Sequence, residues 1–347
     1  MKATSNFHSF QFLRVFWLLL VGVTFSLSVT SCSDDDDTPT GGTQQNIVQV
    51  AQGNADFSIL VAAVTKADLA TTLSSPGPFT VFAPNNAAFA KLAGGPLDAF
   101  STAAKINAVT DANQIAALRN VLLYHVVGAN VRAADIATGA STALTAKPAG
   151  TSGVNDNTLY LTKTGTTVSL NGGTRVVTAD IAASNGTIHA IDNVLLPPSQ
   201  TIAAIVRASA SANPAQFTLL LEALSRPAAS ALLATASANA SNITVFAPTD
   251  AAFRAALMAL GLQSLSQVPD ATLVSILQKH IVGSGRVFSS DLAPGNVATL
   301  NGNITVAAVA NGVTVRGGSG TAANIATANV LATNGVVHVI DQVLQLP

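Results

Sequence analysis

Apolar and polar positions follow the same pattern twice along this chain. In 47–73 and again in 202–233, apolar residues recur at steps of three and four, which predicts amphipathic helices. A short apolar strand follows each helical region, at 79–83 and at 243–247, and each strand ends at a proline. The first half of each copy is therefore expected to be mainly helical, with one strand.

The second half of each copy changes from helix to strand. Asn85 or Thr249 follows the proline and is expected to cap the next helix. A further helical segment ends near His125 in the first copy and near His280 in the second. Beyond it, short β-type runs are separated by Gly and Asn turns, and a final apolar strand closes each copy. Helices followed by strands predict an α+β domain, with helices packed on a mostly antiparallel sheet.

Three longer blocks recur in the same order, which indicates that the body of the chain is one domain written twice. Four of the five histidines fall in these blocks, at matched places. The block pairs are 79–89 with 243–253, 124–128 with 279–283, and 185–192 with 334–341. We therefore expect two domains, at 47–198 and at 199–347.

The composition narrows the classes of function. Charged residues make up 10% of the 347 residues and the net charge is -1, whereas typical soluble domains are roughly 25% charged. No basic face for nucleic acid is therefore expected. The chain has one tryptophan, Trp17, and two tyrosines, Tyr124 and Tyr160. Few aromatic rings are thus available to stack on sugars or bases.

The first residues have the features of an export signal. In 1–31, basic residues accompany an apolar run that is short for a membrane span. The run ends in Val-Thr-Ser before Cys32, a sequence that resembles the lipidation box of bacterial lipoproteins. Because Cys32 is the only cysteine, we expect it to carry a lipid anchor and the mature chain to lack disulfides. The alternative is an ordinary secretory cleavage site beside an accidental cysteine.

An acidic segment rich in Thr, Pro and Gly follows at 32–46 and is typical of a flexible tether. Its four aspartates, 34–37, resemble the signal that directs some Gram-negative lipoproteins to the outer leaflet of the outer membrane. A solvated acidic spacer is the alternative. We expect a lipid-anchored protein of the cell envelope, located at the outer membrane and exposed at the cell surface.

The repeated blocks together resemble the fasciclin (FAS1) domain. Its landmarks are a Thr-Val-Phe-Ala-Pro strand, a Tyr-His pair and an Asn-Gly-x-Ile-His-x-Ile-Asp strand. The first copy has all three, and the second lacks only the tyrosine. The resemblance implies two tandem domains of α+β class, each a wedge-shaped β-sandwich with flanking helices. It also implies extracellular adhesion or ligand binding rather than catalysis.

The resemblance also indicates candidate contact residues. In animal members, integrin binding has been attributed to the Tyr-His region and to an Asp-Ile pair before the last strand. These match Tyr124, His125, Asp180 and Ile181 here. The second copy has lysine in place of the tyrosine and asparagine in place of the aspartate. We therefore expect the first copy to carry more of any protein-directed adhesion. The alternative for the Tyr-His pair is a structural role at a helix end.

The remaining histidines are expected to be structural. His189 and His338 stand in apolar strands and His280 ends a helix, so each needs a hydrogen-bond partner inside its domain. No carboxylate or cysteine stands at a ligand spacing beside them, so neither a metal nor another cofactor is expected. Acid–base chemistry by His189 with Asp192 is disfavoured, because residues three apart on a strand face opposite sides. No catalytic residue is assigned.

These observations favour a non-enzymatic lipoprotein with two adhesive domains on a tether. Its partner is expected to be an extracellular protein or polysaccharide: a matrix component, a cell-surface molecule or a surface polymer. The alternative is a structural or assembly role in the envelope, with the repeats docking to each other or to an envelope partner. A third and less favoured class is an enzyme that acts on an extracellular polymer.

Overall fold

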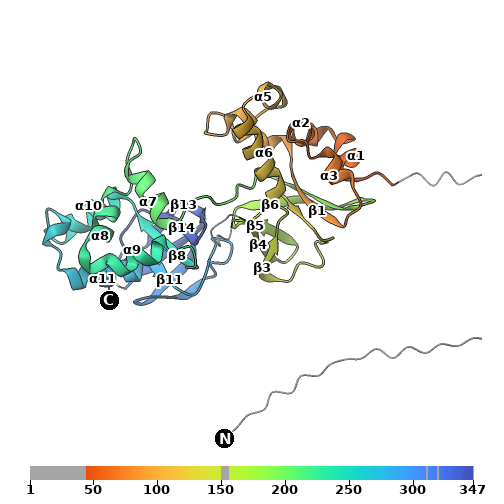
Figure 1. Ribbon diagram of the computed structural model, residues 1–347. Helices are drawn as coiled ribbons and strands as arrows, with labels where there is room; N and C mark the ends of the chain where they lie inside the picture. Colours follow the sequence, from red (N-terminus) through yellow and green to blue (C-terminus); the bar gives the residue numbers. More distant parts are fainter. Residues whose placement is uncertain (1–43, 150–155, 310–311, 319, 347) are drawn as a thin grey trace, which may run out of the picture. The chain divides into compact units, whose positions relative to one another are not determined.

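The computed structural model describes residues 44–347 except 150–155, 310–311, 319 and 347 (Figure 1). The predicted leader at 1–31 and Cys32 lie outside the described residues, as does most of the tether. Residues from Gln44 onward form one compact unit. This unit contains both copies of the repeat, and all four clusters of the hydrophobic core lie within it.

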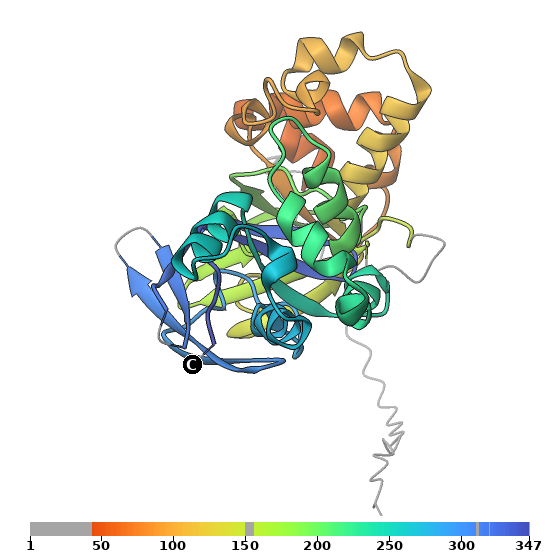
Figure 2. The same ribbon diagram turned by 90° about the vertical axis from the view of Figure 1, so that its left-hand side faces the viewer.

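The first copy begins with helices and ends with strands. Its helices, red to yellow, gather on one face of its strands in both views (Figures 1 and 2). The helices are α1 (Ile47–Gln52), α2 (Ser58–Lys66), α3 (Ala70–Ser74), α4 (Asn86–Ala90), α5 (Ala103–Ala108) and α6 (Ala112–Tyr124). The strands are β1 (Phe79–Pro84), β2 (Val126–Val127), β3 (Gly139–Leu144), β4 (Thr158–Thr164), β5 (Thr167–Leu170), β6 (Thr174–Ala183) and β7 (Gly186–Ile191).

The second copy likewise begins with helices and ends with strands, but among its described residues it has no α-helix that corresponds to α5. Its helices are α7 (Ile202–Ala210), α8 (Thr218–Ser225), α9 (Ser230–Ser237), α10 (Asp250–Ala259) and α11 (Asp270–Lys279). Its strands are β8 (Ile243–Pro248), β9 (Ile281–Val282), β10 (Gly295–Thr299), β11 (Gly302–Val309), β12 (Gly312–Gly317), β13 (Ala323–Ala332) and β14 (Gly335–Ile340). The predicted α+β class is confirmed in both copies.

Each copy has a seven-stranded sheet with the same topology. The spatial orders are β2-β1-β7-β6-β5-β4-β3 and β9-β8-β14-β13-β12-β11-β10. Among the described strands, β1 with β7 and β8 with β14 pair in parallel, and the other pairs are antiparallel. In the first copy, the residues just after edge strand β3 meet edge strand β2, since Ala146 N–H donates to the Val126 oxygen at 2.6 Å. In the second, Leu300 N–H donates to the Ile281 oxygen at 2.8 Å. The predicted sandwich is therefore one sheet that almost closes into a barrel.

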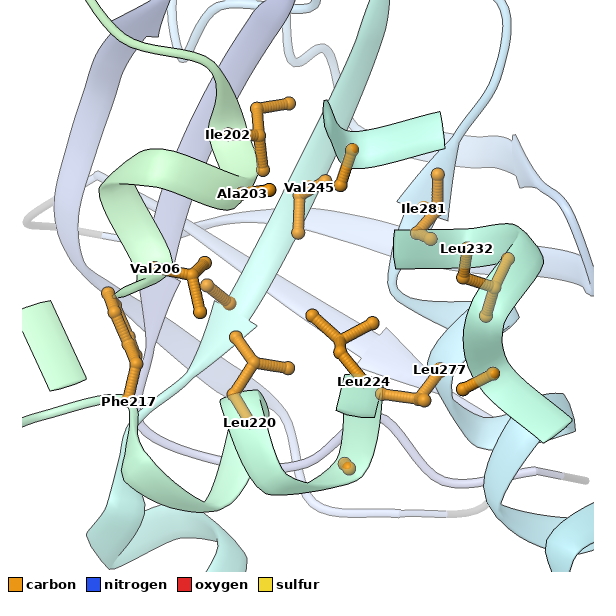
Figure 3. Packing of buried hydrophobic residues seen from close by; sticks show 14 of the residues in the cluster. Ile202, Ala203, Val206, Phe217, Leu220, Leu224, Leu232, Val245, Leu277 and Ile281 are labelled. Carbon is orange, nitrogen blue, oxygen red and sulfur yellow. The ribbon is translucent and has the colours of Figure 1, made fainter. Parts of the chain in front are cut away.

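Strands β1 and β8 are buried on both faces, which explains their continuous apolar sequences. Val81 packs with the helices, whereas Phe82 packs into the second cluster with Tyr124. Val245 and Phe246 divide in the same way in the second copy. Figure 3 shows the helix-facing cluster of that copy, in which side chains from α7, α8, α9 and α11 pack around Val245.

An Asn-Gly turn joins the helical and β parts of each copy. Asn185 accepts from Ile47 N–H at 2.9 Å and donates to the carbonyls of Leu73 and Ser75 at 2.8 Å. Asn334 makes the matching three bonds in the second copy. A Cβ on Gly186 would lie 1.9 Å from the Phe79 oxygen, so only glycine fits there.

The predicted helix caps are also confirmed. Asn85 accepts from Ala88 N–H at 2.8 Å at the start of α4. Thr249 accepts from Ala252 N–H at 3.2 Å at the start of α10. The strand-proline-cap sequence therefore sets where each helix begins.

Candidate functional site

His189 connects three segments of the first copy. Its Nδ1 accepts from Asp180 N–H at 3.2 Å, so its Nε2 carries the proton and donates to the Val131 oxygen at 2.8 Å. Its ring stacks on Phe82, with centroids 5.4 Å apart. The side chain is completely buried.

His338 occupies the matching place in β14. It accepts from Asn329 N–H at 3.4 Å and donates to the Val287 oxygen at 2.8 Å, and it stacks on Phe246 at 5.3 Å. Burial lowers the pKa of His338. Two ring nitrogens that already bond to backbone groups have no capacity left to bind a metal.

The second histidine pair ends the helices α6 and α11. In each, Nδ1 donates to a carbonyl of the preceding helical turn and Nε2 accepts a backbone N–H from the segment after the last strand. The partners are Val121 and Leu195 for His125 (2.7 and 2.9 Å), and Ile276 and Leu344 for His280 (2.8 and 2.9 Å). Burial lowers the pKa of His125 and of His280 to about 4, so both rings are neutral at pH 7.

Tyr124 is the position at which the Tyr-His landmark differs between copies. Its hydroxyl donates to the Thr158 oxygen at 2.7 Å and accepts from Asn171 Nδ2 at 3.2 Å. Burial raises the pKa of this tyrosine. Lys279 replaces it in the second copy and is also buried.

The candidate contact residues therefore divide into two groups. Tyr124 and His125 are only 0% and 1% exposed, so neither side chain is available to a partner in this conformation. Asp180 is exposed and Ile181 is half-buried. The part of the candidate adhesion site that reaches the surface is thus reduced to Asp180 and Ile181.

Asp180 and Asn329 share one backbone role. Both have positive φ values, 59° and 61°, which Asp and Asn tolerate better than most residues. The Asp180 carboxylate accepts from Ala133 N–H at 2.9 Å, and the Asn329 carbonyl oxygen accepts from Ser289 N–H at 2.8 Å. Their own N–H groups donate to His189 and His338. The fold therefore requires a side-chain oxygen here, but not a charge.

Asn329 also makes a contact that Asp180 does not. Its Nδ2 donates to the Gly172 oxygen of the first copy at 2.9 Å. Around it, further residues of the second copy contact the first. Thr162 donates to Asp291 at 2.7 Å, Phe288 packs on Tyr160 with centroids 5.4 Å apart, and the Arg286 guanidinium lies 5.0 Å from the Tyr160 centroid.

Sequence reasoning did not find this inter-copy cluster. Arg286 and Asn130 occupy matched positions, since each precedes the valine whose carbonyl accepts from a buried histidine. The sequence signal that could have indicated this cluster is the difference between the copies at this position, with arginine in the second and asparagine in the first. This position lies just outside the shared blocks at 124–128 and 279–283.

Metal ligands and the His189–Asp192 pair are the groups that reaction chemistry could use here. No group of three or more metal-ligating side chains occurs among them. His189 and Asp192 bond to different backbone groups, because Asp192 accepts from Arg175 N–H at 2.8 Å. Within the described range, no single helix is long and apolar enough to cross a membrane. The bent pair at 218–225 and 227–237 meets that criterion by length and composition only.

Comparison with known proteins places these features in a family. A family model described as the fasciclin domain matches residues 55–197 and 215–347. Protein sll1483 of Synechocystis is 41% identical over 152 residues, which cover 44% of this chain and 73% of that protein. Immunogenic protein MPB70 of Mycobacterium bovis is 30% identical over 164 residues, 46% of this chain and 72% of that protein.

Two further matches extend over both copies. The transforming growth factor-beta-induced protein ig-h3 of Sus scrofa is 27% identical over 273 residues, which are 78% of this chain and 35% of that protein. A solved domain pair from the insect cell adhesion molecule Fasciclin I covers 82% of this chain and 92% of its own, at 18% identity and a TM-score of 0.36.

Proposed function

Because this chain belongs to the fasciclin domain family, we propose that it is a non-enzymatic adhesion or ligand-binding protein that acts outside the cell. Fasciclin domains are found in cell-adhesion and extracellular proteins. Its partner is a matrix component, a cell-surface protein or a surface polymer, and the first copy provides the main contact surface.

One observation carries the assignment to the first copy. Asp180 is exposed, and among the described residues its carboxylate makes one side-chain hydrogen bond, to Ala133 N–H. Its counterpart Asn329 donates its side-chain amide to the Gly172 carbonyl of the first copy. An exposed carboxylate offers an acceptor to a partner, and Ile181 beside it keeps part of its side chain at the surface while the rest packs against the helix-facing core.

The anchoring part of the proposal depends on the sequence. Cys32 carries lipid, and the chain from Gln44 onward is held by the tether at the outer surface of the outer membrane. Replacing Cys32 with Ala removes the anchor, since stable membrane binding takes two or more acyl chains and Cys32 is the residue proposed to carry them. The Cys32→Ala protein is expected in the soluble fraction. Membrane retention after normal cleavage would contradict the anchor, and protection of the wild type from external protease would contradict surface display.

The adhesion part is tested by attachment of cells or purified matrix proteins to the immobilised chain. Asp180→Asn keeps an oxygen for Ala133 N–H and tolerates positive φ, so the change removes the charge and leaves the loop intact. We expect attachment to fall at least fivefold. The matched control is Asp111→Asn, an exposed cap of α6 whose oxygen also accepts a backbone N–H. Equal attachment by the wild type and both variants would remove Asp180 from the site.

A structural or assembly role in the envelope is the second candidate, and the contacts between the copies favour it. A chain whose repeats dock to each other presents a defined surface to an envelope partner. Cross-linking in intact cells distinguishes the two: an assembly role predicts capture of an envelope protein in the absence of any external ligand, whereas adhesion predicts ligand-dependent cross-links.

A further inference from the structure

A polar pocket of about 400 Å³ lies where the second copy contacts the first. Its walls come from β3 and β4 on one side and from the loop at 284–291 on the other. The residues that matter to its chemistry are Ser141, Tyr160, Thr162, Arg286 and Asp291. This volume is within the range of small-molecule sites, about 300–1,000 Å³. It is far larger than the space needed for a few waters.

Arg286 brings a positive charge to this pocket that no acid in the described part of the chain compensates. Its Nη1 donates to Asn242 Oδ1 at 2.6 Å and its Nη2 to the Thr333 oxygen at 2.6 Å, and both acceptors are neutral. Nε has no hydrogen-bond partner. The ion pairs found within the described residues involve other cations. Burial lowers the pKa of this arginine, yet a guanidinium stays charged in proteins.

The acidic residue of the pocket, Asp291, makes its hydrogen bonds to groups other than Arg286. Asp291 accepts from the Thr162 hydroxyl at 2.7 Å, from Phe288 N–H at 3.0 Å and from the Ser290 hydroxyl at 3.3 Å. These bonds fix its carboxylate on the wall of the pocket, where it has limited capacity for another donor. A ligand that suits the pocket therefore brings its own negative charge to Arg286 and neutral hydroxyls to the rest of the wall.

We propose that this pocket binds the carboxylate of an acidic sugar, a uronic acid unit. The carboxylate pairs with the Arg286 guanidinium through an N–H that its bonds to Asn242 and Thr333 leave over, since a guanidinium has five donors; Nε is buried and is not the contact atom. The sugar hydroxyls meet the hydroxyl groups of Ser141 and Thr162. A neutral sugar leaves the arginine uncompensated, and an amino acid requires a free acid for its ammonium group. The first copy has Asn130 in place of Arg286, so this copy has no equivalent site.

The chain itself supplies an optical probe for the test. A protein that begins at Gln44, where the compact unit begins, has no tryptophan and two tyrosines. Tyr160 borders the pocket, whereas Tyr124 is buried beneath Thr158. Galacturonate is titrated while tyrosine emission is followed. Galactose and glutamate serve as the neutral-sugar and amino-acid comparisons, and thermal unfolding provides a second readout.

We expect saturable binding of galacturonate, and at least tenfold weaker binding of galactose and of glutamate. Arg286→Met should weaken galacturonate binding at least tenfold, whereas Arg254→Met, an exposed arginine on α10, should leave it unchanged. Because Arg286 also contacts Tyr160, Ser141→Val is the second variant, since this residue lines the pocket without any inter-copy bond. We expect it to weaken binding at least threefold. No saturable signal, equal affinity for galactose, or unchanged affinity in both pocket variants would overturn the proposal.

Discussion

The two copies carry out the same structural task at Asp180 and Asn329 and present different surfaces there. Each residue has positive φ, accepts a backbone N–H through a side-chain oxygen and donates its own N–H to a buried histidine. Only Asn329 adds an amide N–H, which donates to Gly172 of the other copy. A carboxylate there would place its oxygen against a carbonyl oxygen. Docking between the copies therefore accounts for the asparagine, whereas the exposed aspartate of the first copy makes no bond to the second copy and is the residue proposed to contact a partner.

The largest effect is expected where the copies are most alike. A side chain at Gly186 or Gly335 would meet a backbone oxygen at 1.9 or 2.1 Å, so β7 and β1, or β14 and β8, must separate. Gly186→Ala and Gly335→Ala are each expected to cost more than about 4 kcal/mol of the free energy of unfolding. Gly128→Ala is the control, because nothing lies within 4 Å of its added Cβ. The losses of unfolding free energy are measured by urea denaturation. Equal losses for Gly128→Ala and for the two test variants would contradict the close approach of Gly186 and Gly335 to the neighbouring strands.

Acid should weaken both copies equally. His125 and His280 have their pKa lowered to about 4 by burial, whereas an unfolded histidine titrates near 6.5. The unfolded chain therefore takes up protons first as the pH falls. Stability is fully present above pH 6.5 and is lost between pH 6.5 and 4, by about 3 kcal/mol for each histidine. Chemical denaturation at pH 7.5 and 4.5 measures this. A loss of stability at low pH that is confined to one copy would contradict the matched burial of His125 and His280.

The strand histidines should have a smaller effect. His189→Ala and His338→Ala each leave a part-buried backbone N–H and a part-buried carbonyl without their histidine partner, which costs on the order of 1–3 kcal/mol. Calorimetry of both variants against the wild type gives the loss. Wild-type stability in either variant would mean that the two backbone bonds contribute nothing.

The sequence predicts most of the shared fold and little of what distinguishes the copies. Periodicity and turn residues correctly predicted the helices, the caps at Asn85 and Thr249 and the mostly antiparallel strands, because these depend on local patterns. The burial of Tyr124 could not be predicted in this way, since an aromatic ring at a helix end suits either a core or a surface. The contacts of Asn329 and Asp291 join residues more than a hundred positions apart, and no local pattern records them.

The smallest expected effect concerns the contact between the copies. Asn329→Asp keeps the oxygen for Ser289 N–H and removes the donor to Gly172, which should cost about 1–2 kcal/mol. The loss is measured by urea denaturation at pH 7. Asp180→Asn should change stability by less than about 0.5 kcal/mol, because no partner within the described residues requires its charge. Equal losses in these two variants would contradict the difference between the copies.

The measurement that tests the account most directly combines these two variants in one attachment assay. Wild type, Asp180→Asn and Asn329→Asp are immobilised at equal density on a surface and exposed to cells or matrix proteins at a temperature at which all three are folded. We expect Asp180→Asn to lose attachment at least fivefold and Asn329→Asp to retain it. Loss of attachment in Asn329→Asp with full attachment by Asp180→Asn would place the contact surface on the second copy and contradict the account.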